Sequence, residues 1–197
     1  MNTLVLASAS PRRRELLAQL GLQFVVTPSD IDESQHAQEE PMVYVARLAR
    51  EKAMVHATPD RCVLGADTVV TLLDEPRILG KPGDREGARR MLERLSDKSH
   101  TVITATHLQW GDIARARVVQ SEVRFAALST ADIEAYLDCN EWHDKAGGYA
   151  IQGLAGAFVV SISGSYSNIV GLPLCEVVQD LRAIGAVPTE WGIGRAC

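Results

Sequence analysis

A short apolar segment that leads straight into a proline-started helix is the feature that most constrains how this chain folds. Leu4–Ser8 has the apolar character of a buried strand, and Ser10 follows it at a position suited to capping a helix. Pro11 fits the first helical position, where a backbone N–H is not needed, and Gly21 ends the helix predicted over Pro11–Leu20. The chain therefore opens with a strand and a helix joined by a tight turn.

The rest of the sequence continues to alternate between strand and helix patterns. Further strands are predicted over Gln23–Thr27, Cys62–Leu73, Thr101–Trp110, Arg115–Phe125 and Phe158–Ile162. The second of these is expected to be interrupted at Gly65-Ala66-Asp67. Further helices are predicted over Pro41–His56, from Asp84 through Leu95, over Ser129–Cys139 and over Pro173–Ile184. Asp84 is predicted to cap its helix, and Ser129 and Asp132 have the spacing of a capping box. The two strands that flank Gly111 and Asp112 are predicted to form a hairpin. The 197 residues contain no repeat or linker, so we expect one α/β domain, or one domain with a small lobe, built on a mixed sheet.

The composition excludes several classes of protein. The net charge is −5, so a general nucleic-acid binder is not expected, and an anionic substrate would need a local concentration of Lys and Arg. No apolar run approaches the length of a membrane span, and no signal peptide is recognised. The four cysteines, Cys62, Cys139, Cys175 and Cys197, show no CxxC spacing, which argues against a disulfide framework or a zinc site. These features predict a cytoplasmic protein without membrane or nucleic-acid partners.

The stretch SASPRRREL combines a helix start with serines and arginines. The free N–H groups at a helix N-terminus form a natural anion site, to which Ser8 and Ser10 add hydroxyls and Arg12 and Arg13 add positive charge. Consecutive helical residues point roughly 100° apart, so the three arginines cannot all face one ligand. From this stretch alone, both an anion site and a solvated helix face stay open.

One carboxylate lies inside an apolar strand pattern. Asp67 occurs within LGADTVV, where a carboxylate must be paired, bound to a metal or catalytic. The alternative is a buried aspartate that is paired with an arginine for structural reasons. Glu33, near Asp30 and Asp32, lies in a loop that could supply a second carboxylate to a hard cation, although acidic loops are usually just solvated.

Three further polar residues have contexts that suit a ligand site. Lys52 lies late on the Pro41–His56 helix and, taken alone, is an ordinary surface lysine. Lys81 lies in the tight loop GKPG, which could present it rigidly to a phosphate or could be a plain turn. Gln152 follows two glycines in a segment that either approaches a ligand closely or is a flexible surface loop.

Taken together, these segments resemble the Maf family of nucleoside triphosphate pyrophosphatases. The segments that carry the resemblance are, in family order, SASPRRRELL, LAREKA, LGADTVV, GKP, HTVITA, DKAGGYAIQGLAG and GSYSNIVGLPL. They cover the chain from Leu4 to Leu181, whereas Val187–Cys197 lies outside the resemblance and is assigned no role. The resemblance implies a single domain over residues 1–197 with an elongated mixed sheet flanked by helices, and two lobes around a central cleft. Dimers are frequent in such families, so a homodimer is an option that the sequence leaves open.

The same resemblance implies hydrolysis of a nucleoside triphosphate to the monophosphate and pyrophosphate with a divalent metal, Mg²⁺ or Mn²⁺. By motif, Asp67 is the proton acceptor that activates water. The residues carried over as triphosphate ligands are Ser8, Arg12, Arg13, Lys52 and Lys81, which leaves Arg14 as the arginine expected to be solvated. Glu33 and Asp67 are the implied metal ligands, Glu33 with less support because its loop matches the family less closely.

The residues at Arg12, Thr68 and Gln152 place the chain by resemblance in the branch that acts on dTTP and UTP. The branch that acts on 7-methyl-GTP typically carries Gln after the Asp and Glu in the later loop, whereas this chain has Thr68 and Gln152. Uracil and thymine present an N3–H donor between two carbonyl acceptors, which one glutamine amide can satisfy. The alternatives are the 7-methyl-GTP branch, a non-catalytic nucleotide-binding regulator of septum formation, and a phosphohydrolase acting on sugar phosphates or dinucleotides.

Overall fold

The computed structural model describes residues 3–72 and 77–187, which form a mixed α/β fold. The strands are β1 (Thr3–Leu6), β2 (Phe24–Val26), β3 (Arg61–Leu72), β4 (Ile78–Leu79), β5 (Ser99–Trp110), β6 (Ile113–Phe125) and β7 (Val159–Ser163). The α-helices are α1 (Pro11–Ala18), α2 (Pro41–Met54), α3 (Arg85–Leu95), α4 (Thr130–Asp138), α5 (Tyr166–Val170) and α6 (Leu174–Ala183). Two short 3₁₀ helices, η1 (Ala146–Gly148) and η2 (Leu154–Phe158), lie in the glycine-rich segment.

The sheet is mixed, as predicted. Within the described residues it has seven strands in the order β2-β1-β3-β5-β6-β7, with β4 paired to β3. β1 pairs in parallel with β2 and β3, whereas the β3–β4 and β6–β7 pairs are antiparallel. The predicted hairpin is present, since β5 and β6 are neighbours joined at Gly111, whose φ of +53° suits a tight turn.

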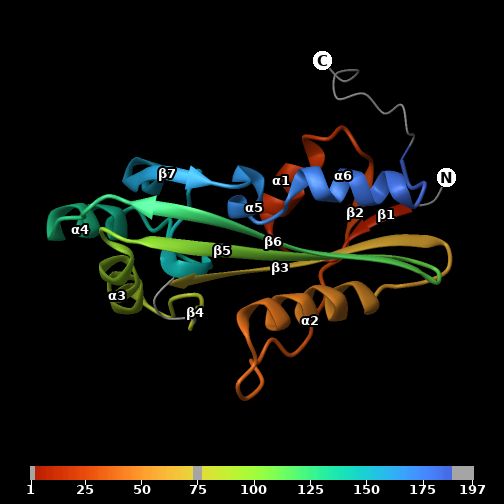
Figure 1. The fold of residues 1–197 in the computed structure, drawn as a ribbon, viewed down its shortest axis with the longest axis horizontal. Helices are drawn as coiled ribbons and strands as arrows, with labels where there is room; N and C mark the ends of the chain where they lie inside the picture. The colour runs from red at the N-terminus through yellow and green to blue at the C-terminus, as the bar shows by residue number, and fades with distance from the viewer. Residues whose placement is uncertain (1–2, 73–76, 188–197) are drawn as a thin grey trace. The chain divides into compact units, whose positions relative to one another are not determined.

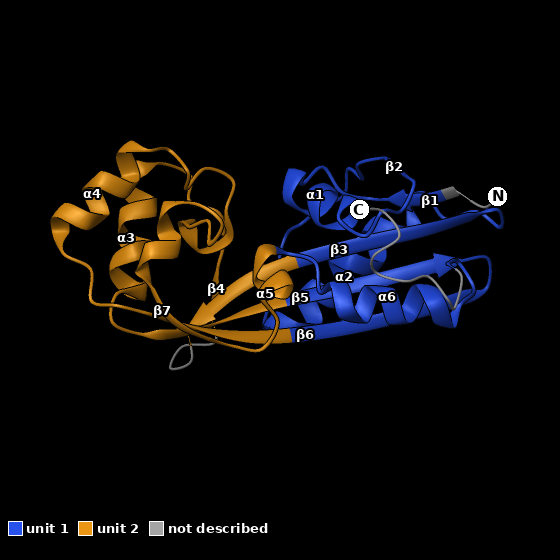
Figure 2. Cartoon of the chain, turned by 90° about the horizontal axis from the view of Figure 1, so that it is seen from above, with its two compact units in different colours: residues 1–67, 104–119, 171–197 blue, residues 68–103, 120–170 orange. Residues whose placement is uncertain are grey.

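The chain forms two compact units, and each unit is made of segments that are separate in the sequence (Figure 2). Unit 1 contains residues 1–67, 104–119 and 171–197, and unit 2 contains residues 68–103 and 120–170. The central cleft between two lobes stays a prediction. No helix among residues 3–72 and 77–187 has the length and apolar character needed to cross a membrane.

Within unit 1, α2 covers one face of the strands while α1 and α6 cover the other (Figure 1). Gly65 on β3 lets α2 approach closely, because a Cβ at this position would lie 2.7 Å from the backbone nitrogen of Ala53 on α2. Val5 and Val63 are buried on neighbouring parallel strands and pack in one cluster with Ala53. Lys52 precedes Ala53, so this packing fixes the end of α2 beside β3.

Unit 2 is built around its own apolar core, which includes aromatic residues from several elements. Phe125 and Tyr149 pack edge-to-face with their ring centroids 4.9 Å apart, and the buried His100 ring lies against both. Two of its helices begin with the caps that the sequence predicts: Asp84 accepts a hydrogen bond from the Gly87 N–H, and Ser129 and Asp132 form a capping box.

Candidate active site

Asp67 and Lys52 form a buried ion pair in unit 1. Asp67 lies on β3 with only 8% of its surface exposed, and its Oδ1 is 2.7 Å from Lys52 Nζ. Lys52 belongs to the last turn of α2, which Gly65 allows to pack directly on β3. Asp67 is therefore paired, as its apolar surroundings require, but with a lysine rather than with the arginine that the structural alternative supposed.

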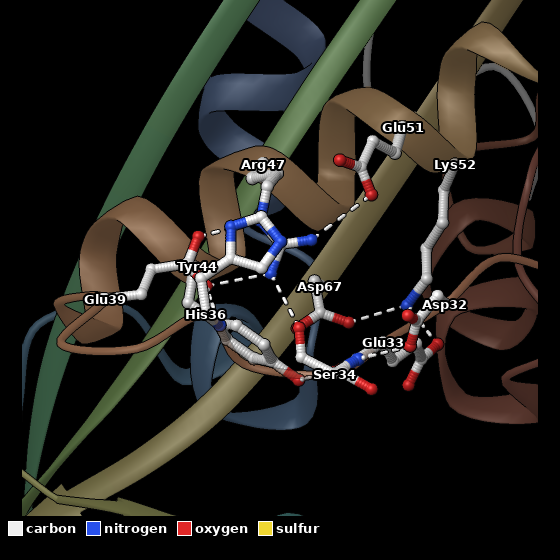
Figure 3. A network of polar contacts seen from close by, with 10 residues as sticks. All are labelled: Asp32, Glu33, Ser34, His36, Glu39, Tyr44, Arg47, Glu51, Lys52 and Asp67. Carbon is white, nitrogen blue, oxygen red and sulfur yellow. Dashed lines mark hydrogen bonds and ion pairs between the residues drawn. The ribbon is translucent and has the colours of Figure 1, made fainter.

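Lys52 also reaches the loop that carries Glu33. Its Nζ lies 2.7 Å from Glu33 Oε1, so one ammonium bridges two carboxylates (Figure 3). The Glu33 side chain is 48% exposed, whereas those of Lys52 and Asp67 are 9% and 11% exposed. A charged cluster of this kind has a protected side on β3 and an accessible side at Glu33, which is the arrangement that a site for a polar ligand requires.

Arg13 is buried between three segments that the sequence separates widely. Its Nη1 donates to Ser8 Oγ at 3.2 Å and to the Ala66 carbonyl at 2.8 Å, and its Nε donates to the Gly171 carbonyl at 2.8 Å. Burial lowers the pKa of the Arg13 guanidinium, and the nearby Asp67 acts in the opposite direction. Arg13 thus ties the start of α1 to the residue before Asp67.

The other two arginines of the opening stretch lie differently. Arg14 is exposed, as predicted for the solvated member, and Arg12 is half-buried. Arg13 is the arginine that faces inward, and its guanidinium donates hydrogen bonds to the backbone carbonyls of Ala66 and Gly171. Its predicted contact with a triphosphate stays a prediction, as does that of Arg12.

The charges of this cluster balance one another. Glu33 and Asp67 carry two negative charges, and Lys52 and Arg13 carry two positive charges, with Lys52 in direct contact with both carboxylates. A polyphosphate entering here would add several negative charges, so further cations would have to accompany it. The predicted contributors are Arg12, Lys81 and a divalent metal.

The donor set of the cluster suits a hard divalent cation that arrives with a substrate. Among residues 3–72 and 77–187, no group of three or more His, Cys, Asp or Glu side chains could hold a metal ion. Glu33 and Asp67 nevertheless supply carboxylate oxygens, and Mg²⁺ is commonly held by one or two carboxylates together with water and substrate phosphates. Mn²⁺ accepts the same oxygen ligands. The residues present therefore fit Mg²⁺ or Mn²⁺.

Three of the predicted site residues belong to unit 2. Thr68 follows Asp67 on β3 and is half-buried, Lys81 is exposed between β4 and α3, and Gln152 is exposed between η1 and η2. The Gln152 segment is held locally, because the Leu154 N–H donates to Glu141 Oε2 at 2.9 Å. The approach of Lys81 and Gln152 to a nucleotide stays a prediction.

Two side chains on α2 that the sequence reasoning did not identify take part in the cluster. The Tyr44 hydroxyl donates to the Glu33 carbonyl at 2.7 Å, and Arg47 Nη2 donates to the Ser34 carbonyl at 3.0 Å (Figure 3). Tyr44 and Arg47 are three residues apart, so their side chains are neighbours on the surface of the helix. That spacing was the available signal, but it also fits an ordinary surface face.

Comparison with known proteins decides the family. A profile described as "Maf-like protein" matches residues 3–184, nearly the whole chain. The chain belongs to this family. A Cereibacter sphaeroides protein named dTTP/UTP pyrophosphatase is 53% identical over 185 residues, covering 93% of this chain and 95% of the relative. A Shewanella denitrificans protein of the same name is 51% identical over 192 residues, covering 92% and 96% of the two chains.

A solved structure with a partly similar backbone is the HAM1 protein from Coxiella burnetii. It is 20% identical with a TM-score of 0.46, and the match covers 65% of this chain and 75% of that protein.

Proposed function

We propose that this Maf-like protein is a nucleoside triphosphate pyrophosphatase that hydrolyses dTTP and UTP to the monophosphate and pyrophosphate. The observation that carries the proposal is the Lys52 ammonium held 2.7 Å from both Glu33 and Asp67, a cluster of the charges that phosphoryl transfer needs. The named activity of relatives that are about half identical over nearly the whole chain supports the same conclusion.

The phosphates would be held by Lys52 together with the predicted ligands Arg12 and Lys81. The Lys52 ammonium has three N–H donors, of which the two carboxylates take two, so the third can donate to a phosphate oxygen. Arg12 would present a planar donor fork to a phosphate, and Lys81 would act as a point charge. Ser8 and Arg13 lie at the start of α1, where backbone N–H groups also favour an anion.

Asp67 would serve as the proton acceptor for the attacking water. Its Oδ1 is committed to Lys52, so Oδ2 is the atom that would take the proton as water attacks the α-phosphorus. The ion pair keeps the carboxylate in place while it does so. Pyrophosphate then leaves with the electrons of the cleaved P–O bond, and the monophosphate carries the oxygen that came from water.

A divalent cation is part of the proposal. Glu33 and Asp67 would hold it, and when bound it would neutralise phosphate charge and lower the pKa of a coordinated water. With this cation, the charge brought by the triphosphate would be shared among the metal, Lys52, Arg12 and Lys81.

Recognition of the base is assigned to Thr68 and Gln152, with Arg12. The Gln152 amide can accept from the N3–H of uracil or thymine and donate to a neighbouring carbonyl. A glutamate there would accept but not donate, which suits a guanine edge instead. We therefore expect a Gln152→Glu variant to lose at least about tenfold of its preference for pyrimidines, because a carboxylate offers no donor to the carbonyl groups of the base.

A substrate panel tests the proposal. The purified full-length chain is incubated with Mn²⁺ and, separately, with dTTP, UTP, CTP and 7-methyl-GTP, and the products are identified by chromatography. We expect the highest kcat/KM for dTTP and UTP, with equal amounts of monophosphate and pyrophosphate. Preference for the methylated purine would move the protein to the other branch, free phosphate would indicate a different phosphohydrolase, and no turnover would favour a nucleotide-binding regulator.

A further inference from the structure

The loop that carries Glu33 is fastened to α2 by two side chains one helical turn apart. Tyr44 donates from its hydroxyl to the Glu33 carbonyl at 2.7 Å. Arg47 reaches the residue after it, donating from Nη2 to the Ser34 carbonyl at 3.0 Å. The loop is therefore attached to the helix at two consecutive carbonyl groups, on the backbone that determines where the Glu33 side chain begins.

The second of these side chains also holds the far end of the loop. Arg47 binds Glu39 through two hydrogen bonds, Nε to Oε1 at 2.7 Å and Nη2 to Oε2 at 2.8 Å (Figure 3). The bidentate geometry fixes orientation as well as distance. The Arg47 guanidinium carbon lies 5.5 Å from the centre of the Tyr44 ring, so the two anchoring side chains also contact each other.

These anchors matter because Glu33 lies at the surface. Nearly half of its side chain is exposed, yet its carboxylate stays 2.7 Å from Lys52 Nζ. Because one partner of this ion pair is half-exposed, solvent weakens the attraction between the two charges. The hydrogen bonds to the loop backbone therefore help to set the position of Glu33 relative to Lys52 and Asp67.

The anchors keep their protonation states over the working range of an enzyme. The hydrogen bond to Arg47 lowers the pKa of Glu39 to about 2, and the same bond raises the pKa of Arg47. Burial, with Asp67 and Glu33 nearby, raises the pKa of Tyr44 to about 12, so its hydroxyl keeps the proton that it donates. Neither contact is expected to change between mildly acidic and mildly alkaline pH.

We propose that Tyr44 and Arg47 are positioning residues that hold Glu33 beside Lys52 and Asp67 for catalysis. This inference rests on the proposed pyrophosphatase function, in which Glu33 holds the divalent cation. Neither side chain needs to touch the substrate. Their contribution is to keep a half-exposed carboxylate at a fixed place, since a displacement of the order of 1 Å can lower a rate about a hundredfold.

The test is a double-mutant cycle between Tyr44→Phe and Glu33→Gln. Tyr44→Phe removes only the hydroxyl, and we expect kcat to fall about tenfold and the Mn²⁺ concentration for half-maximal activity to rise. In the Glu33→Gln background, whose residual turnover sets the baseline, Tyr44→Phe should change nothing further, because its effect acts through Glu33. Equal losses in both backgrounds would contradict the proposal. Arg50→Gln, an exposed position on the same helix, is the matched control and should leave kcat unchanged.

A second measurement does not depend on activity. Hydrogen exchange of the backbone amides at residues 32–36 should become faster in Tyr44→Phe and in Arg47→Gln, while exchange within β3 stays as it is. Unchanged exchange in the loop of both variants would overturn the proposal. If the wild-type chain hydrolyses none of the nucleotides, the pyrophosphatase function fails, and this exchange experiment still decides whether the two side chains fix the loop.

Discussion

Lys52 lies where two carboxylates would otherwise face each other without compensation. Two like charges brought out of water repel each other, and a mostly buried Asp67 is tolerated because an ammonium contacts it directly and the Arg13 guanidinium lies nearby. The second carboxylate, Glu33, is accessible to solvent and therefore to a ligand. The cluster thus combines a buried carboxylate, Asp67, with an accessible carboxylate, Glu33, that an incoming cation can reach.

Replacing Asp67 with Asn should separate catalysis from folding. The Asn side chain can still accept the Lys52 N–H through its carbonyl oxygen, and Lys52 keeps its contact with Glu33, so the variant should still fold. It cannot accept a proton from water, and we expect kcat to fall roughly 100- to 10,000-fold. Steady-state kinetics together with urea unfolding measure both effects. Near wild-type turnover in a folded Asp67→Asn variant would remove Asp67 from the mechanism.

At the level of single residues, the sequence is most informative where a charged side chain falls in a segment that is expected to be buried. Asp67 could be singled out because a carboxylate in an apolar strand needs a partner, and the structure supplies one. The helical period also predicted that the arginines would divide, and Arg13 is buried while Arg14 is exposed. Tyr44 could not be identified, because its partner is a backbone carbonyl in a loop whose path no local pattern reveals.

The close contact between α2 and β3 is the element-level feature on which the cluster depends. Gly65 faces the helix backbone, and a Cβ there would come within 2.7 Å of Ala53 N. Ala53 is fully buried beside Lys52, so neither helix backbone nor strand can shift without moving the ion pair. Gly65 permits a short distance between α2 and β3 that a larger residue would prevent.

We therefore expect Gly65→Ala to lower the unfolding free energy by about 3 kcal/mol or more, because the clash is with backbone rather than with a flexible side chain. Urea unfolding of the purified variant gives the value. Gly83→Ala is the matched control, since a Cβ there meets nothing within 4 Å, and its effect should stay within about 0.5 kcal/mol. A Gly65→Ala protein as stable as the control would contradict the close packing of α2 on β3.

Most elements could be predicted from the sequence, and the exceptions are short. The long strands β5 and β6 have strong strand patterns, and single capping residues, Asp84 and Ser129, mark the starts of α3 and α4. β4 has two residues and exists through its pairing with β3, and α5 has five residues, so neither carries a periodic signal. The strand containing Gly65 was expected to be interrupted, yet β3 is continuous because its hydrogen-bonded neighbours keep it extended.

At the scale of the whole molecule, the stability of the chain should depend on a buried histidine far from the charged cluster in the sequence. His100 is fully buried, and its Nε2 lies 2.7 Å from the Tyr149 hydroxyl. Burial lowers the pKa of His100 from its ordinary 6.5 to about 4. The folded chain therefore keeps this ring neutral at pH values where the unfolded chain binds a proton.

The sign of the effect follows from that difference. As pH falls through about 6.5 the unfolded state gains a proton and the folded state does not, so stability decreases until pH reaches about 4. Across this pH range, the titration of His100 lowers the free energy of unfolding by about 3 kcal/mol in total. A His100→Gln variant should lose this part of the pH dependence, measured by urea unfolding near neutrality and near the acid end of the window. The exposed His143, replaced in the same way, should retain it, and an unchanged slope in His100→Gln would contradict the assignment.

The central claim is that water, activated at Asp67, attacks the α-phosphorus of a pyrimidine nucleoside triphosphate. Hydrolysis of UTP in heavy-oxygen water, followed by mass spectrometry of both products, tests it directly, because the label marks the phosphorus that was attacked. We predict one labelled oxygen in the uridine monophosphate and none in the pyrophosphate. Label in the pyrophosphate, or release of unlabelled monophosphate, would contradict the account.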